Sequence, residues 1–254
     1  MTVAGADLTS LRAMTLIGLG LAILAAWVGM AALHGEAAWA LETFAALCLA
    51  VGGSADLTLF PAVLIMWLLM SVAMMLPTAL PTIDLYVQIT RRMEEGRALR
   101  IALFVLGYLV AWSVFGTTAA ALQIAVRPLL DDVLAPALFA GGLVALAGAY
   151  QLSPLKQACL DLCRNPMLFF MSRWTETPGG VLGLGIRHGV ICIGCCWALM
   201  LLMFVGGAMN LVWMAALGLI MLAEKVLPFA KTWGRVGGVL MISAGAVTIT
   251  ANLI

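Results

Sequence analysis

The sequence predicts an all-α fold: a polytopic helical membrane protein of about seven transmembrane helices, with its N-terminus inside and its C-terminus outside. Two observations predict it. Of the 254 residues, 64% are hydrophobic and only 10% are charged, which is far too little polar surface to coat a soluble domain. The apolar residues also fall in runs near the ~20 residues that a helix needs to cross a bilayer. Backbone groups in lipid must be satisfied within the chain, so such runs predict helices.

The first predicted span covers residues 14–33, whose apolar core is too long for a signal peptide. Residues 41–51 are apolar but few, so they predict an interfacial or re-entrant segment. The second span covers residues 59–76 and is expected to end at Pro77 and Pro81.

The other predicted spans follow the same length rule. They are residues 101–122, 133–152, 185–205, 208–223 and 233–251. Together the spans make residues 1–254 a single integral membrane domain. The longest connection, residues 153–184, is predicted to be a cytoplasmic loop that contains cysteine.

The basic residues test this topology, because cytoplasmic loops are enriched in Lys and Arg. With the N-terminus inside, 12 of the 13 basic residues fall on the cytoplasmic side and Arg127 falls outside. The inside group is Arg12, Arg91, Arg92, Arg97, Arg100, Lys156, Arg164, Arg173, Arg187, Lys225, Lys231 and Arg235. One span more or fewer between these clusters would place some of them on the outside, against the rule. The net charge of +1 and the lack of a basic patch with aromatics give no reason to expect nucleic-acid binding.

A group of soft ligands opens the fifth span. His188, Cys192 and Cys196 are spaced four residues apart and share one helix face, with Cys195 beside them. Thiols and an imidazole are ligands for zinc or Cu(I). One straight helix cannot surround an ion, so other segments must contribute.

The cysteine-containing loop offers such ligands. Cys159 and Cys163 are also four residues apart, and the nearby cations Lys156 and Arg164 would favour their thiolates. If the loop folds back on the fifth span, these two cysteines meet Cys192 and Cys196. Cysteine also packs as a small apolar residue, so a coincidence of buried thiols is the alternative.

Two weaker signals accompany the cysteines. Met70 and Met74, together with Met66, share one face of the second span and could bind Cu(I) weakly, although methionine is also ordinary core filler. Glu224 and Lys225 lie at the inner end of the sixth span, where ionisable residues indicate either function or side chains that reach for the headgroups. Being adjacent on a helix, they point in different directions and are not expected to pair with each other, and Glu224 could instead pair with Arg187 or Lys156.

Several strings, in order along the chain, resemble a known family. They are AMMLP (73–77), YQLSPLKQACLDLCRNP (150–166), GIRHGVICIGCCWALM (185–200), GAMNLVWM (207–214) and AEK (223–225). The resemblance is to a bacterial family of predicted metal-binding integral membrane proteins, a domain of unknown function, and it extends from about Trp67 to the C-terminus. It implies a multi-pass protein of the bacterial inner membrane that binds a metal.

The leading hypothesis is therefore an inner-membrane protein that handles copper or zinc, by transport or delivery, through a Cys/His site at the cytoplasmic membrane face. Its partners would be the lipid bilayer, the metal ion and a membrane or soluble protein. A membrane thiol-redox protein that uses the C-x-x-C pair Cys192 and Cys195 is one alternative. A non-catalytic membrane subunit or assembly factor is another. With only two His in the chain, a His-rich oxidase centre is not expected, and no catalytic residue can be named.

Overall fold

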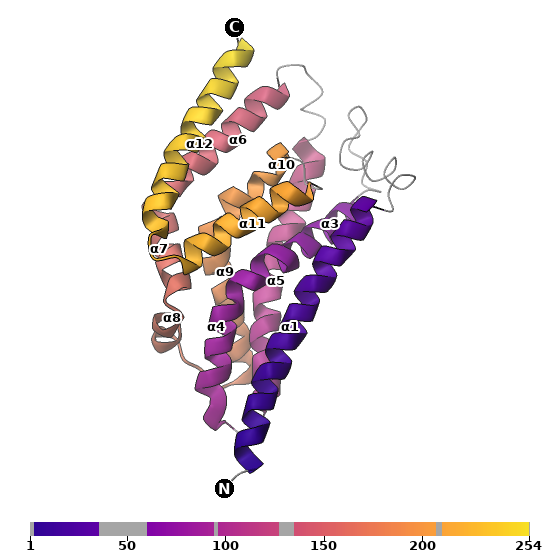
Figure 1. Cartoon of the computed structure of the whole chain (residues 1–254), viewed down its shortest axis with the longest axis vertical. Coiled ribbons are helices and arrows are strands. Elements are labelled where there is room, and N and C mark those ends of the chain that lie inside the picture. The colour runs from indigo at the N-terminus through magenta and orange to yellow at the C-terminus, as the bar shows by residue number, and fades with distance from the viewer. Residues whose placement is uncertain (1–2, 36–59, 94–95, 127–134, 207–209, 254) are drawn as a thin grey trace.

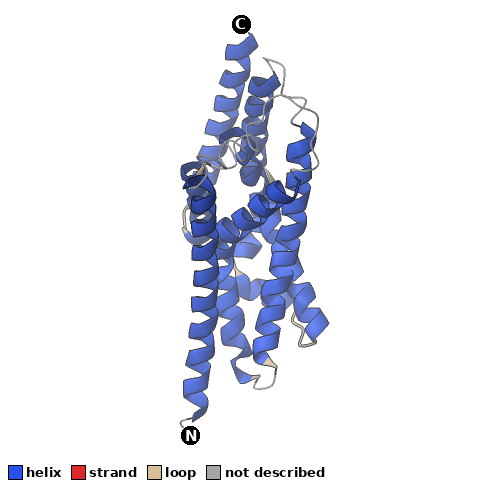
Figure 2. Ribbon diagram, turned by 90° about the vertical axis from the view of Figure 1, so that its right-hand side faces the viewer, coloured by secondary structure: helices blue, strands red, loops and turns tan. Residues whose placement is uncertain are grey.

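The computed structural model describes residues 3–35, 60–93, 96–126, 135–206 and 210–253. Over these ranges the regular structure is helical and contains no strand (Figure 2), so the all-α class is confirmed. The helices are α1 (Val3–Gly35), α3 (Phe60–Met70), η2 (Ser71–Met75), α4 (Leu76–Ile89), η3 (Thr90–Arg92), α5 (Arg97–Val126), α6 (Ala135–Gln151), α7 (Pro154–Arg164), α8 (Pro166–Ser172), α9 (Pro178–Leu201), α10 (Met203–Gly206), α11 (Leu211–Val226) and α12 (Ala230–Leu253).

Five helical stretches are long and apolar enough to cross a membrane, and a sixth is added if α6 and α7 count as one span bent by 64°. α11 has 16 residues and is shorter than these stretches. Each predicted span thus has a helical counterpart, whereas membrane insertion and the number seven stay predictions. Residues 41–51 and Arg127 lie outside the described residues.

The predicted end of the second span is wrong, because the helix continues through Pro77 and Pro81 to Ile89. The five residues before this segment, Ser71–Met75, form a π-helical turn. Pro77 has no N–H to donate to the carbonyl of Ala73, and the indole N–H of Trp27 donates to that oxygen instead at 3.2 Å. A side chain from α1 therefore satisfies the group that the proline leaves unpaired.

Short polar motifs begin the helices that hold the cysteines. Ser153 accepts a hydrogen bond from the backbone N–H of Lys156 at 3.1 Å, and Thr177 accepts one from Gly180 at 3.2 Å. A proline follows each of these caps, at the first helical position, where a missing N–H costs nothing. The predicted loop 153–184 therefore contains the ordered helices α7 and α8.

Helices α5 and α9 pack with their backbones in contact, because glycine lies at the crossing. A Cβ at Gly185 would overlap the carbonyl oxygen of Phe104, and one at Gly107 would overlap that of Leu182. Figure 1 shows these two helices side by side in the middle of the molecule, with α11 crossing near them and α6 paired with α12. The buried core lies between α3, α4, α5, α9 and α11.

We predict that Gly185→Ala lowers the free energy of unfolding by about 1–3 kcal/mol, because the added methyl group forces α5 and α9 apart. Gly183 is the matched control: it lies on the same helix, and a Cβ there has no heavy atom within 4 Å. Gly183→Ala is expected to be neutral or to stabilise by up to ~1 kcal/mol. Thermal unfolding of the two variants in detergent measures the difference, and equal stabilities would contradict the backbone contact.

Candidate metal centre

Three thiols meet in the core of the molecule. Cys192, Cys195 and Cys196 on α9 are each 1% exposed, and their sulfur atoms lie within 4.8 Å of one another. The sulfurs of Cys195 and Cys196 lie 3.3 Å apart. The helical spacing expected from the sequence therefore produces a compact group of three buried sulfurs.

The ammonium group of Lys225 lies beside this group. From the last turn of α11 its Nζ donates to the Cys192 sulfur at 3.0 Å and to the Thr78 hydroxyl at 2.7 Å, and the side chain is buried. A buried cation is costly unless it is hydrogen-bonded and its charge is compensated. The Cys192 thiolate is the form of this sulfur that compensates it.

Hydroxyl groups from α4 and α5 extend this contact into a network of polar atoms. Thr78 donates to the carbonyl oxygen of Met75 at 2.8 Å. The Tyr108 hydroxyl lies 2.8 Å from the same oxygen and 3.3 Å from the Cys192 sulfur, so its single proton can be donated to either acceptor. Because Lys225 joins Cys192 to Thr78, this network connects the π-helical turn with α4, α5, α9 and α11.

The cysteine-containing segment folds back on α9. The Cys163 sulfur lies 3.8 Å from that of Cys195, and Cys159 packs against Gly194, where a Cβ would be 2.7 Å from its sulfur. The docking agrees with the sequence expectation, because the Cys163 thiol interacts with Cys192 as well as with Cys195. Cys159 and Cys163 are both partly exposed, unlike the three cysteines of α9.

Cations that the sequence places near Cys159 and Cys163 have other partners. Lys156 forms a buried ion pair with Glu224 at 2.7 Å, and Gln151 is hydrogen-bonded to both of these residues. Arg164 donates to the carbonyl of Leu227 at 2.6 Å. These contacts hold α7 against the end of α11, and the cation that faces the thiols is Lys225 instead. As expected, Glu224 and Lys225 do not pair with each other.

His188 is buried one helical turn before Cys192, outside the group of sulfurs. Its ring lies among those of Phe104, Tyr108 and Phe169, with centroids 5.9, 5.6 and 5.3 Å away. Its Nδ1 makes no hydrogen bond. His188 is buried on the same helix as Cys192 and Cys196, but the structure does not bring the imidazole into the group of three thiols.

The predicted methionine ladder is buried, since Met66, Met70 and Met74 are exposed by 2% or less. The π-helical turn begins directly after Met70, so the regular spacing of the ladder is interrupted before Met74. Met74 packs against Gly218 of α11, where a Cβ would be 3.7 Å from its Cγ. Burial of this kind suits core packing and a thioether ligand alike.

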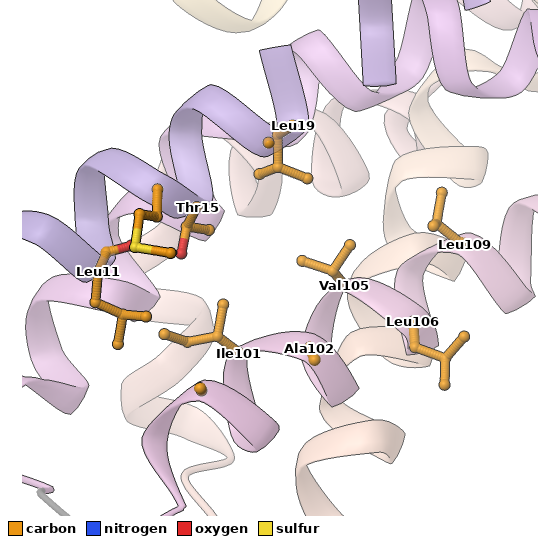
Figure 3. A pocket seen from close by; sticks show the side chains of 11 residues that line it. Leu11, Thr15, Leu19, Ile101, Ala102, Val105, Leu106 and Leu109 are labelled. Carbon is orange, nitrogen blue, oxygen red and sulfur yellow. The ribbon is translucent and has the colours of Figure 1, made fainter. Parts of the chain in front are cut away.

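A separate cleft of about 420 Å³ lies between α1 and α5. Figure 3 shows its side chains on the two facing helices. They are Leu11, Met14, Thr15, Gly18, Leu19, Ala98, Ile101, Ala102, Val105, Leu106 and Leu109. Since none of them is titratable or a thiol, this cleft is not the metal centre.

The thiol group has the size and chemistry of a soft-metal site. A metal–thiolate bond is about 2.3 Å long, so sulfurs around one ion lie about 4 Å apart, close to the arrangement observed here. Thiolates are preferred by Cu(I) and by zinc. Fold and site together define a helical protein with a buried cysteine centre suited to a soft metal.

A comparison with protein families points to copper. The family model described as PpoB2, copper chaperone, matches residues 64–248. This match covers most of the chain, which therefore belongs to that copper chaperone family. The metal-related family expected from the sequence strings is confirmed, and copper rather than zinc is supported. Neither the curated proteins nor the solved structures contain a match to this chain.

We predict that Cys163 and Cys195 form a disulfide on mild oxidation when the other four cysteines are replaced by serine, because their sulfurs are already 3.8 Å apart. The loss of both thiols from maleimide–polyethylene glycol labelling under denaturing conditions measures the bond. A variant that keeps Cys195 alone is the control and should stay fully labelled. If both thiols remain reactive after oxidation, α7 does not dock on α9 as described.

Lys156→Met is expected to destabilise the protein by about 3–5 kcal/mol, because it leaves the buried Glu224 carboxylate without its cation. Adding Glu224→Met should recover most of this loss. The matched control is Lys231→Met, which breaks an exposed pair with Asp161 and should cost ~1 kcal/mol or less. Unfolding in detergent gives the three values, and a single variant as stable as the control would refute the role of the pair.

Proposed function

We propose that this protein is an inner-membrane copper chaperone that holds Cu(I) on Cys192, Cys195 and Cys196 and delivers it to a partner protein. The observation that carries the proposal is the group of three buried sulfurs in a chain of a copper chaperone family. The five apolar helical stretches and the one-sided distribution of basic residues support the membrane location.

Delivery requires a route from the buried sulfurs to the surface. Cys163 provides the first step, since its sulfur is 3.8 Å from Cys195 and its side chain is partly exposed. Cys159, one helical turn earlier on α7, is also partly exposed and offers a second thiol on the same helix. Exchange of one sulfur at a time between neighbouring thiolates would move Cu(I) along α7 to a partner that offers soft ligands of its own.

His188, Met70 and Met74 stay further candidate donors of the same centre. The imidazole has an unpaired Nδ1 one turn from Cys192, and the two thioethers are buried in the core that surrounds it. Thioethers bind Cu(I) more weakly than thiolates do, so they suit a station that releases the ion readily.

A membrane thiol-redox function is the second candidate, and the contact between Cys163 and Cys195 favours it. Thiol exchange requires an accessible thiolate, however, and Cys192 and Cys195 are both buried. The cysteines of a metal chaperone stay reduced while the metal is bound and released. Those of a redox protein alternate between thiol and disulfide.

We predict that the purified protein binds one Cu(I) per chain under anaerobic, reducing conditions, as measured by competition with a chromophoric Cu(I) chelator. Cys192→Ser/Cys196→Ser should weaken the affinity at least ~100-fold, because two of the three soft ligands are removed. Cys48→Ser, a cysteine far along the chain from this group, is the control and should bind as the wild type does. A double variant with wild-type affinity would overturn the proposed site.

A further inference from the structure

Three thiols do not by themselves distinguish Cu(I) from Zn²⁺, since both ions accept thiolate ligands. A centre that binds Cu(I) in preference to Zn²⁺ can distinguish the two ions by their charge. Lys225, the cation that lies against the sulfurs, is a feature that responds to this charge, and its role rests on the proposed copper function.

The positive charge of Lys225 is held in place from two sides. Its Nζ donates to the Cys192 sulfur at 3.0 Å and to Thr78 at 2.7 Å, within the core. Thr78 is held in turn by the carbonyl of Met75. The ammonium group therefore cannot move away from the sulfurs without breaking both of its hydrogen bonds.

No carboxylate cancels this charge within the described part of the chain. The adjacent acid, Glu224, is paired with Lys156, and the other two ion pairs there join Arg12 to Asp84 and Lys231 to Asp161. An ion bound by the three sulfurs consequently lies within a few ångströms of a fixed unit of positive charge.

We propose that Lys225 is a specificity-determining residue whose fixed charge makes the thiol centre favour monovalent Cu(I) over divalent ions such as Zn²⁺. The repulsion between the ammonium group and a divalent ion is twice that for a monovalent ion in the same position. At an effective dielectric constant of about 20 and a separation of about 6 Å, this difference corresponds to roughly a hundredfold in relative affinity. The hydrogen bond to Cys192 favours the thiolate for both ions alike, so it does not alter their ratio.

The test compares Cu(I) and Zn²⁺ dissociation constants, each measured by chelator competition on the full chain in detergent. Lys225→Met removes the charge and the hydrogen bonds, Lys225→Gln removes the charge but retains a donor, and Lys225→Arg retains the charge. Lys231→Met, at an exposed lysine, is the matched control. The expected result is a shift toward Zn²⁺ of at least ~10-fold in the Met and Gln variants, with the Arg variant and the control within ~3-fold of the wild type.

The outcomes separate this inference from the proposed function. Wild-type protein that binds Cu(I) while the Gln variant retains the wild-type ratio overturns the role of Lys225 and leaves the copper centre in place. Wild-type protein that binds no Cu(I) overturns the proposed function and the inference with it. A purely structural role of Lys225 would weaken both ions equally, which the ratio detects. If Lys225→Met does not yield monodisperse protein, the ratio of the two dissociation constants in Lys225→Gln decides the test.

Discussion

The contact between a buried ammonium group and a cysteine sulfur is the interaction on which the centre of this molecule depends. Lys225 lies in the core, where an uncompensated charge would cost several kcal/mol. Its bonds to Cys192 and Thr78 require α11, α9 and α4 to converge at one point. Tyr108 brings α5 to the same sulfur, so four helices are placed by one cluster of polar atoms.

The last turn of α11 fixes the two halves of the thiol arrangement through adjacent residues. Glu224 holds Lys156 at the start of α7, while Lys225 holds Cys192 on α9. Because neighbouring helix residues point in different directions, one short segment can position both cysteine-containing helices. This explains how Cys163 reaches Cys195 although 32 residues separate them in the sequence.

The helical class and the grouping of the cysteines follow directly from the sequence, because hydrophobic length and helical periodicity are local properties. The predictions that were wrong depend on contacts with residues from other helices. The helix passes Pro77 because Trp27, on another helix, supplies a donor to the carbonyl of Ala73. His188 shares a face with Cys192 but is surrounded by aromatic rings from other elements.

The partners of the charged residues could be predicted only in part from the sequence. Lys156, one of the two candidate partners of Glu224, does pair with it, whereas the approach of the distant Lys225 to the thiols was not predicted. Charge at the end of an apolar helix indicates a buried partner, and for Lys225 the sequence does not show that this partner is a cysteine.

The central claim is that copper is held by the sulfurs of α9, and X-ray absorption at the copper K-edge tests it most directly. The copper-loaded protein is predicted to show Cu(I) with a shell of sulfur neighbours at about 2.3 Å, which disappears when Cys192, Cys195 and Cys196 are all replaced by serine. A first shell of nitrogen and oxygen atoms, or an unchanged sulfur shell in the triple variant, would contradict the account.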